Sequence, residues 1–192
     1  MRKPRSHVSQ VAFENEWVTV KVDTLTFGQN RQYSYSYVAK RHPGVMVVPY
    51  FTKNDSILMT QQYRHPVHKI ALGFPGGAIE DGFTPEAAGR KEMLEETGYQ
   101  AKKLIDLGPF MPDIGIQSDI GRIFLAIDPV KVAEPTQNTD EETTIPIIKT
   151  VNEIKQLIDD GQIRDGWSLG PLLLFLLWRE SQKLKVESKK WW

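Results

Sequence analysis

One helix, signalled at both of its ends, constrains the fold of this chain more than any other part of the sequence. Thr84 has the side chain of a helix N-cap, and Pro85 takes the first helical position, where its missing N–H is not needed. Gly98 then ends the helix, because glycine readily adopts the left-handed conformation that follows a last turn. A glycine- and proline-rich loop, residues 72–77, precedes this helix. The sequence therefore predicts a loop followed by a well-delimited helix.

Three glutamates lie on one face of this helix. Spacings of three and four residues bring Glu92, Glu95 and Glu96 together, where their like charges repel one another. A hard divalent cation relieves that repulsion, because Mg²⁺ takes oxygen ligands and also bridges phosphate oxygens. A solvated acidic face is the ordinary alternative. The apolar Met93 and Leu94 beside the carboxylates favour the metal site.

The spacing of these residues resembles that of a known motif, the Nudix box. The box reads Gly, five residues, Glu, seven residues, and then Arg-Glu-U-x-Glu-Glu-x-Gly-U, where U is aliphatic or bulky. The matching positions in this chain are Gly77, Glu92, Met93, Glu95, Glu96, Gly98 and Tyr99. The resemblance implies an α/β fold of the Nudix type, in which a mixed sheet is sandwiched between helices.

The resemblance also implies the metal ligands. Glu92 and Glu96 match the principal ligands of the family, and Glu95 lies close to them. The backbone carbonyl of Gly76 matches a main-chain ligand found just before the box. We therefore expect Mg²⁺ as the cofactor, with Mn²⁺ as the alternative ion.

Two positions depart from the box. Phe83 stands where the family has its first Glu, and Lys91 stands where it has Arg. In the family these two residues form an ion pair, and losing both together avoids leaving one charge alone. The pair supports the loop rather than the metal, so we expect changed loop rigidity and intact chemistry. Glu80, within the loop, is an alternative partner for Lys91.

The segments around the box follow strand and helix patterns. Core strands are expected at residues 45–50, 57–63 and 122–127. Thr150 and Glu153 form a capping box for a second helix, and a last helix begins at about Ser168. Strand alternation at residues 17–25 and 33–37 predicts an antiparallel hairpin near the N-terminus. We expect residues 1–40 to be this hairpin element, which dimerises, and residues 41–192 to be the Nudix hydrolase domain.

Composition excludes several classes of function. Lys plus Arg number 24 and Asp plus Glu number 24, so the chain lacks the basic surplus of a nucleic-acid-binding protein. The absence of cysteine excludes disulfides, thiolate metal sites and cysteine nucleophiles. No signal peptide or membrane-spanning run is recognisable, so we expect no membrane partner and a cytoplasmic location.

Similarity outside the box indicates one branch of the family. The run Gln62-Tyr63-Arg64 and residues 74–77 resemble the ADP-ribose pyrophosphatase and nucleoside-diphosphate-sugar hydrolase branch. Arg64 matches a phosphate-binding arginine of that branch, whose planar guanidinium grips phosphate oxygens through two hydrogen bonds. The alternative is an exposed arginine at the end of a strand.

The same branch implies a homodimer that exchanges its N-terminal strands and stacks the nucleobase at the subunit boundary. Tyr35 is the candidate for that stacking, with Tyr33 and Tyr37 as alternatives. For any one of these tyrosines, packing of the hairpin against its neighbour is the ordinary explanation.

Two further departures concern specificity and catalysis. Ile114 stands where ADP-ribose enzymes have the proline of a Ser-Pro-Gly motif, which weakens an assignment to ADP-ribose alone. The branch has Glu-x-Glu in a late loop, and here Glu141 matches the first Glu while Thr143 replaces the second. Glu141 is therefore the candidate catalytic carboxylate that activates water, and Glu142 is the alternative.

These residues predict Mg²⁺-dependent hydrolysis of the diphosphate linkage of a nucleoside-diphosphate sugar, giving a nucleoside monophosphate and a sugar phosphate. One alternative is a pyrophosphohydrolase acting on RNA or dinucleoside polyphosphates, against which the neutral charge argues. Another is a Nudix module that senses a nucleotide sugar without turnover, which predicts missing carboxylates on the box helix, whereas Glu92, Glu95 and Glu96 are all present here.

Overall fold

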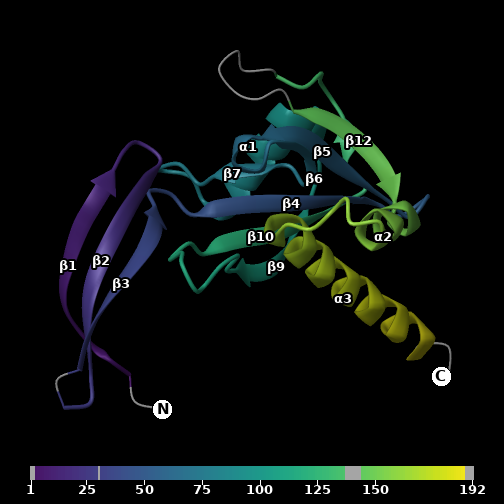
Figure 1. Cartoon of the computed structure of the whole chain (residues 1–192). Helices are drawn as coiled ribbons and strands as arrows, with labels where there is room; N and C mark the ends of the chain where they lie inside the picture. Colours follow the sequence, from purple (N-terminus) through teal and green to yellow (C-terminus); the bar gives the residue numbers. More distant parts are fainter. Residues whose placement is uncertain (1–2, 30, 137–143, 189–192) are drawn as a thin grey trace.

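A mixed sheet forms the centre of the molecule (Figure 1). The computed structural model describes the backbone of residues 3–29, 31–136 and 144–188. The strand order is β12-β5-β4-β10-β9, with β6 beside β5 and β7 beside β4. The bounds are β4 (Gly44–Phe51), β5 (Ser56–Arg64), β6 (Lys69–Gly73), β7 (Gly76–Ala78), β9 (Leu104–Phe110), β10 (Gly121–Ile127) and β12 (Ile145–Thr150). Strands β4 and β10 run parallel, and the other pairs of this sheet are antiparallel.

Strands β4 and β5 separate along their length. They pair with each other only at Tyr50–Phe51 and Ser56–Ile57, beside the turn that joins them. Further along, β5 pairs with β6 while β4 pairs with β7. The segment that joins β6 to β7 therefore enters the space between two diverging strands, and residues 74–77 are held by backbone hydrogen bonds on the β4 side, including Val47 N–H to the Pro75 carbonyl at 2.9 Å.

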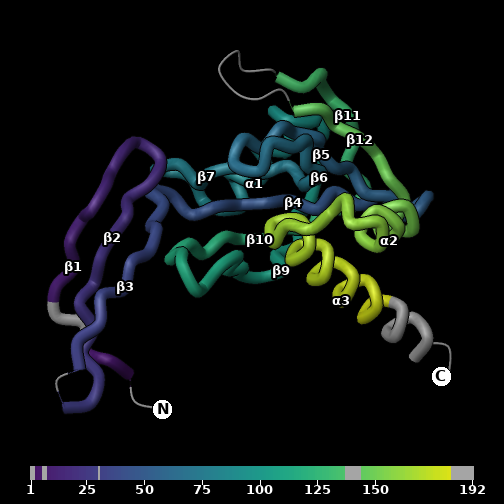
Figure 2. The backbone as a smooth tube through the Cα atoms, viewed as in Figure 1, coloured from purple at the N-terminus to yellow at the C-terminus, as the bar shows by residue number. Residues whose placement is uncertain are grey.

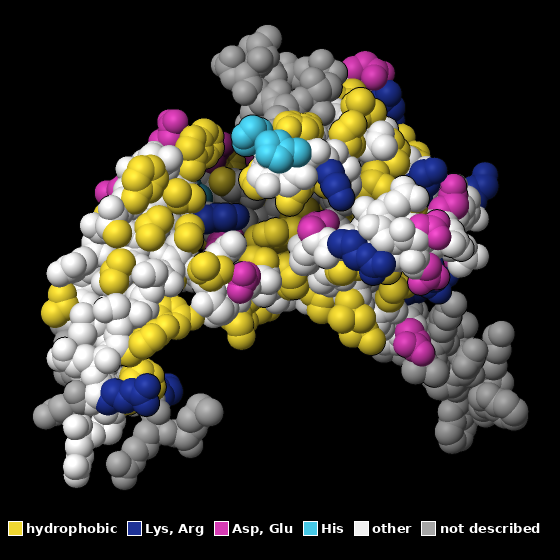
Figure 3. All heavy atoms as spheres, viewed as in Figure 1, with side chains coloured by type: hydrophobic (Ala, Val, Ile, Leu, Met, Phe, Trp, Pro, Cys, Tyr) yellow, Lys and Arg dark blue, Asp and Glu magenta, His cyan; other side chains and the backbone are white. Residues whose placement is uncertain are grey.

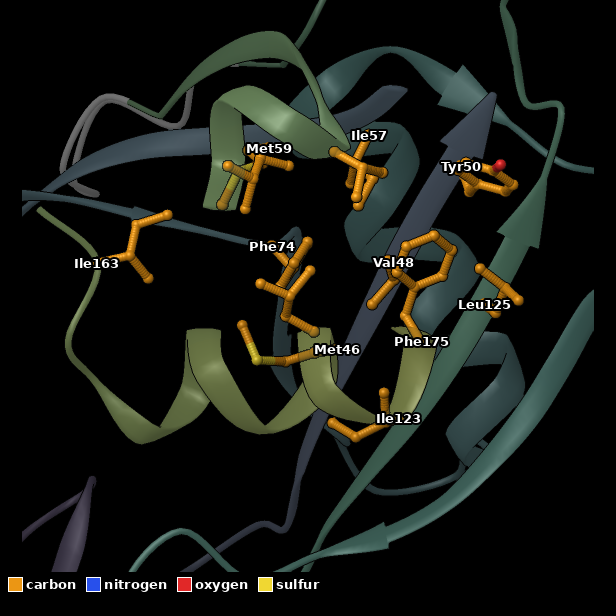
Figure 4. Close-up of a cluster of buried hydrophobic side chains, with 13 residues drawn as sticks. Met46, Val48, Tyr50, Ile57, Met59, Phe74, Ile123, Leu125, Ile163 and Phe175 are labelled. Atoms are coloured by element: carbon orange, nitrogen blue, oxygen red, sulfur yellow. The ribbon is translucent and has the colours of Figure 1, made fainter. Parts of the chain in front are cut away.

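Helices cover both faces of the sheet, which confirms the predicted sandwich. The bounds are α1 (Pro85–Thr97), α2 (Val151–Asp159) and α3 (Gly166–Ser188). Because strand side chains alternate, Val45 and Val47 share a buried cluster with Met93 of α1. Met46, Val48 and Tyr50 join the cluster on the opposite face. Figure 4 shows Phe175 of α3 among the side chains of that second cluster.

The predicted helix ends are confirmed by their hydrogen bonds. The Thr84 hydroxyl accepts from the Ala87 N–H at 3.2 Å, and Gly98 has φ of 75° with its N–H bonded to the Leu94 carbonyl. Thr150 and Glu153 form the complete capping box that starts α2. Within the part of the chain that the structure describes, no helix combines the length and apolar character needed to cross a membrane.

The N-terminal element is a separate antiparallel sheet that projects from the central one. The predicted hairpin corresponds to β2 (Val18–Phe27) and β3 (Arg31–Lys40), and the structure adds a third strand, β1 (Arg5–Glu14). From β3 the chain passes directly into β4 (Figure 2). The short strands β8 (Tyr99–Gln100) and β11 (Val130–Lys131) pair with each other after α1.

Backbone hydrogen bonds fasten β3 to the loop before β10. The Val38 N–H donates to the Ile116 carbonyl at 2.8 Å, and the Ser118 N–H donates to the Val38 carbonyl at 3.0 Å. Lys40 adds an ion pair with the buried Asp119, 3.1 Å between Nζ and Oδ2. The N-terminal sheet and this loop are therefore joined at the end of β3.

Candidate active site

The glycines of β7 lie directly against helix α1. A methyl group built on Gly77 would lie 2.7 Å from the Cδ atom of Glu92, a distance that real Cβ atoms do not reach. A methyl group on Gly76 would meet the Val45 carbonyl and lie 2.9 Å from the Met46 Cα. Gly76 is therefore required by the packing of β7 on β4, and Gly77 by the position of the Glu92 carboxylate.

The carboxylate of Glu96 reaches the same strand. Its Oε2 atom accepts a hydrogen bond from the Gly76 N–H at 3.1 Å. The N–H and C=O of one strand residue point to the same side of the strand. The hydrogen bonds to β4 and to the residues just before it are made by the neighbours of Gly76, for example between Val47 N–H and the Pro75 carbonyl and between Ile79 N–H and the Pro43 carbonyl. The Gly76 carbonyl therefore faces away from β4, on the side where the Glu96 carboxylate lies.

Glu95 forms an ion pair within helix α1. Its Oε2 atom lies 3.5 Å from the Nζ of Lys91, one helical turn earlier. The same ammonium lies 3.2 Å from Oε1 of Glu80, which confirms the predicted alternative pair. Lys91 also lies over the ring of Phe83, 5.9 Å from its centroid. The two residues that depart from the box pattern therefore contact each other.

The pKa of Lys91 reflects these neighbours. Partial burial lowers the pKa, but the hydrogen bond to Glu80 and the charges of Glu95, Glu80 and Glu92 outweigh it and hold the pKa above its ordinary value. Lys91 is therefore a fixed positive charge at neutral pH. The sequence contained a signal for its contact with Glu95, the spacing of four residues along a helix, which our reading of the sequence missed.

The donor set fits a hard divalent cation. Glu92 and Glu96 are four residues apart on α1 and both approach β7, whose Gly76 carbonyl faces the same side. Oxygen donors of this kind, two carboxylates and a carbonyl, are what Mg²⁺ takes from proteins. Among the described residues no group of three or more Asp, Glu or His side chains gathers as a metal site of its own. Glu141 and Glu142, the predicted catalytic residues, lie outside the described residues.

Arg64 and Tyr35 belong to other elements than the box glutamates, Arg64 to β5 and Tyr35 to β3. Arg64 is exposed at the end of β5, where it pairs with Lys69 of β6, and its guanidinium makes no hydrogen bond or ion pair with the side chains that the structure describes. Tyr35 is half-buried on β3, and its hydroxyl donates to the carbonyl of Gly115. The ring of Tyr33 meets that of Tyr35 edge to face at 6.2 Å. The structure thus brings Tyr35 to residues 113–115, the segment that departs from the Ser-Pro-Gly motif.

Comparison with known proteins gives a consistent result. Residues 40–165 match the model of the NUDIX domain family. The chain is 31% identical over 127 residues to the ADP-ribose pyrophosphatase of Bacillus subtilis (strain 168), covering 66% of this chain and 68% of that protein. It is 30% identical over 155 residues to the methanol dehydrogenase activator of Bacillus methanolicus, covering 80% of this chain and 82% of that protein.

The fold is also that of a solved structure. A crystal structure of an ADP compounds hydrolase superposes with a TM-score of 0.82 at 21% identity, covering 95% of this chain and 97% of that one. At this identity the likeness concerns the fold alone. Members of the Nudix family generally use divalent metal ions, which agrees with the donor set on α1 and β7. From the box geometry, the family match over most of the chain and the identity to its members we conclude that the chain belongs to the Nudix family and is a Nudix hydrolase.

Proposed function

We propose that this enzyme hydrolyses the diphosphate linkage of nucleoside-diphosphate sugars of the ADP-ribose type, with Mg²⁺ as the divalent ion. The observation that carries the proposal is the placement of Glu92 and Glu96 against Gly76 and Gly77. The identity to an ADP-ribose pyrophosphatase supports the class of substrate. Because Ile114 replaces the proline of the ADP-ribose enzymes, we expect several nucleotide sugars to be accepted.

The ion would be held by Glu92, Glu96 and the Gly76 carbonyl, with Glu95 beside them. When bound, it would neutralise phosphate oxygens and stabilise the charge that develops on them. The acidic face of α1 otherwise repels a diphosphate, so these carboxylates become useful to the substrate only once their charge is compensated. Their attachment to a strand and a helix keeps them in place before the substrate arrives.

The remaining roles fall to residues outside the box. Glu141, or Glu142 in its place, accepts a proton from the attacking water. The water oxygen forms a bond to one phosphorus, and the bond from that phosphorus to the bridging oxygen breaks. The bridging oxygen leaves with the other phosphate. A nucleoside monophosphate and a sugar phosphate leave. Arg64 holds phosphate oxygens through its guanidinium, and Tyr35 stacks on the nucleobase.

We also propose that residues 1–40 form a homodimer interface. Val8, Val11 and Phe13 of β1 are about half exposed, at 49%, 57% and 54%. Apolar side chains are spread over this sheet in Figure 3. Monomeric proteins rarely leave a contiguous apolar surface uncovered, and an edge strand such as β1 invites pairing with a second chain. A second copy of the sheet satisfies both conditions.

A product screen tests the proposed function. Purified enzyme with Mg²⁺ is incubated with ADP-ribose, ADP-glucose, GDP-mannose, a dinucleoside tetraphosphate and capped RNA, and the products are separated by chromatography. We expect a nucleoside monophosphate and a sugar phosphate from more than one nucleotide sugar. Cleavage confined to the polyphosphate or the RNA would contradict the proposal, as would tight binding of nucleotide sugars without any product.

A further inference from the structure

The ammonium of Lys91 joins two parts of the site that are far apart in sequence. One of its partners, Glu80, belongs to the loop that precedes α1, and the other, Glu95, belongs to α1 itself. The distances are 3.2 Å and 3.5 Å. One side chain thus ties the loop to the helix, and among the box carboxylates it forms its ion pair with Glu95.

Phe83 closes a further side of the same ammonium. The Lys91 side chain is 34% exposed, and its Nζ lies 5.9 Å from the centroid of the Phe83 ring. A cation over an aromatic face is attracted by it, so the ring adds a third contact to the ammonium. The two residues that depart from the box pattern, Phe83 and Lys91, therefore contact each other through this cation–π interaction.

The three box carboxylates consequently have two different environments. Glu92 and Glu96 lie against the β7 glycines, whereas Glu95 lies against Lys91. Lys91 is the positive partner that the described side-chain contacts give Glu95, so its removal would leave this carboxylate free to turn toward a bound cation. A cation held by all three would be bound more tightly, but in a different position.

We propose that Lys91 is a positioning residue that keeps Glu95 out of the metal coordination and so reserves the ion for Glu92, Glu96 and the Gly76 carbonyl. This inference rests on the proposed function for its metal. It adds that Lys91 lowers the affinity for the ion and fixes the position at which the ion binds. A residue with a merely structural role would weaken metal binding when it is removed. Lys91 is expected to do the opposite.

The experiment compares Mn²⁺ binding, followed by the electron paramagnetic resonance of the free ion, with turnover of a nucleotide sugar. In Lys91→Met we expect Mn²⁺ to bind about three- to tenfold more tightly, because a nearby positive charge is lost. We expect kcat to fall about tenfold or more, because the ion is displaced. Lys91→Arg should restore both values, and Lys91→Met/Glu95→Gln should return the affinity to that of the wild type.

Lys149→Met is the matched control. Lys149 is also partly exposed, at 36%, and also pairs with a glutamate four residues later, Glu153, at 3.4 Å. Neither Mn²⁺ affinity nor kcat should change in this variant. Weaker or unchanged Mn²⁺ binding in a folded Lys91→Met protein would overturn the inference. Wild-type turnover in the same preparation tests the proposed function separately, because the affinity comparison needs no substrate.

Discussion

Gly77 and Glu92 lie so close together that the glycine has no room for a methyl group. The ideal Cβ position of Gly77 is 2.7 Å from the Cδ atom of Glu92. The obstructing atoms are the end of a flexible side chain. At Gly76, one residue earlier, the obstructing atoms belong to the backbone of β4. The two adjacent glycines are therefore required for different reasons.

This difference predicts opposite results for two alanine substitutions. Gly77→Ala should leave the melting temperature nearly unchanged, because the Glu92 carboxylate can move aside, and should lower kcat about a hundredfold, because that carboxylate is displaced. Gly76→Ala should instead destabilise the fold by about 1–3 kcal/mol, as overpacking does. Thermal unfolding and turnover, measured on both variants, check the pair.

Gly73→Ala is the control for these variants. Its methyl group would lie 3.7 Å from the Ser168 Oγ, an ordinary contact, and the residue belongs to β6 just before the same loop. It should change neither quantity. A Gly77→Ala protein with full turnover would mean that the Glu92 carboxylate has no fixed place in catalysis.

Tyr35 offers a test of nucleobase stacking. Tyr35→Phe removes the hydrogen bond to the Gly115 carbonyl but keeps the ring, whereas Tyr35→Ala removes both. If the ring stacks on the base, KM should rise about tenfold in the alanine variant and little in the phenylalanine variant, with kcat similar in both. Equal increases in KM would show that the hydroxyl acts by holding the loop and that the ring has no direct role.

The N-terminal interface predicts the response to a single charge. Phe13→Lys places an ammonium in an apolar contact and should convert the dimer to a monomer in light scattering. Leu177→Lys is the matched control, because Leu177 on α3 has nearly the same exposed fraction, 55% against 54%, and lies outside residues 1–40. A wild-type protein that is already monomeric would refute the interface.

Parts of this fold were predictable because local chemistry and tertiary packing agree. Strand β4 and the Ile57–Met59 part of β5 are apolar because both faces are covered there, and α1 is marked by Thr84 and Gly98. The strand β1 was missed because it lies at an edge, where both faces are exposed and its alternation is weak. Pro146 weakens the strand pattern of β12, because a proline fits only an edge strand, and β12 lies at the edge of the central sheet.

The positions of the box glutamates were predictable from the sequence, whereas their role as metal ligands remains a prediction. The box spacing placed Glu92 and Glu96 correctly on one face of α1, because a helix has a fixed period. It left open what Glu95 contacts, and the structure shows an ion pair with Lys91 one turn earlier. The contact of Tyr35 with Gly115 joins residues 80 positions apart, and no local pattern encodes such a contact.

The water-activating carboxylate remains a prediction from the sequence. Glu141→Gln should lower kcat by about two to four orders of magnitude with little change in KM, because it removes a general base. Glu142→Gln should have the smaller effect. If both variants keep full turnover, the base lies elsewhere. Asp119 is a further acid to test, although it is buried and paired with Lys40, so it would have to lose that partner first.

Phosphorus NMR of ADP-ribose with Mg²⁺, followed side by side for the wild type and for Glu96→Gln, tests the central claim most directly. Glu96 accepts the hydrogen bond from the Gly76 N–H, and its substitution removes one metal-binding charge while keeping the shape of the side chain. With the wild type, the account predicts that the diphosphate signals of the substrate are replaced by those of AMP and ribose 5-phosphate. With the folded Glu96→Gln protein, the rate of this replacement should be about a hundredfold or more lower. An intact diphosphate with the wild type, or equal rates for the two proteins, would contradict it.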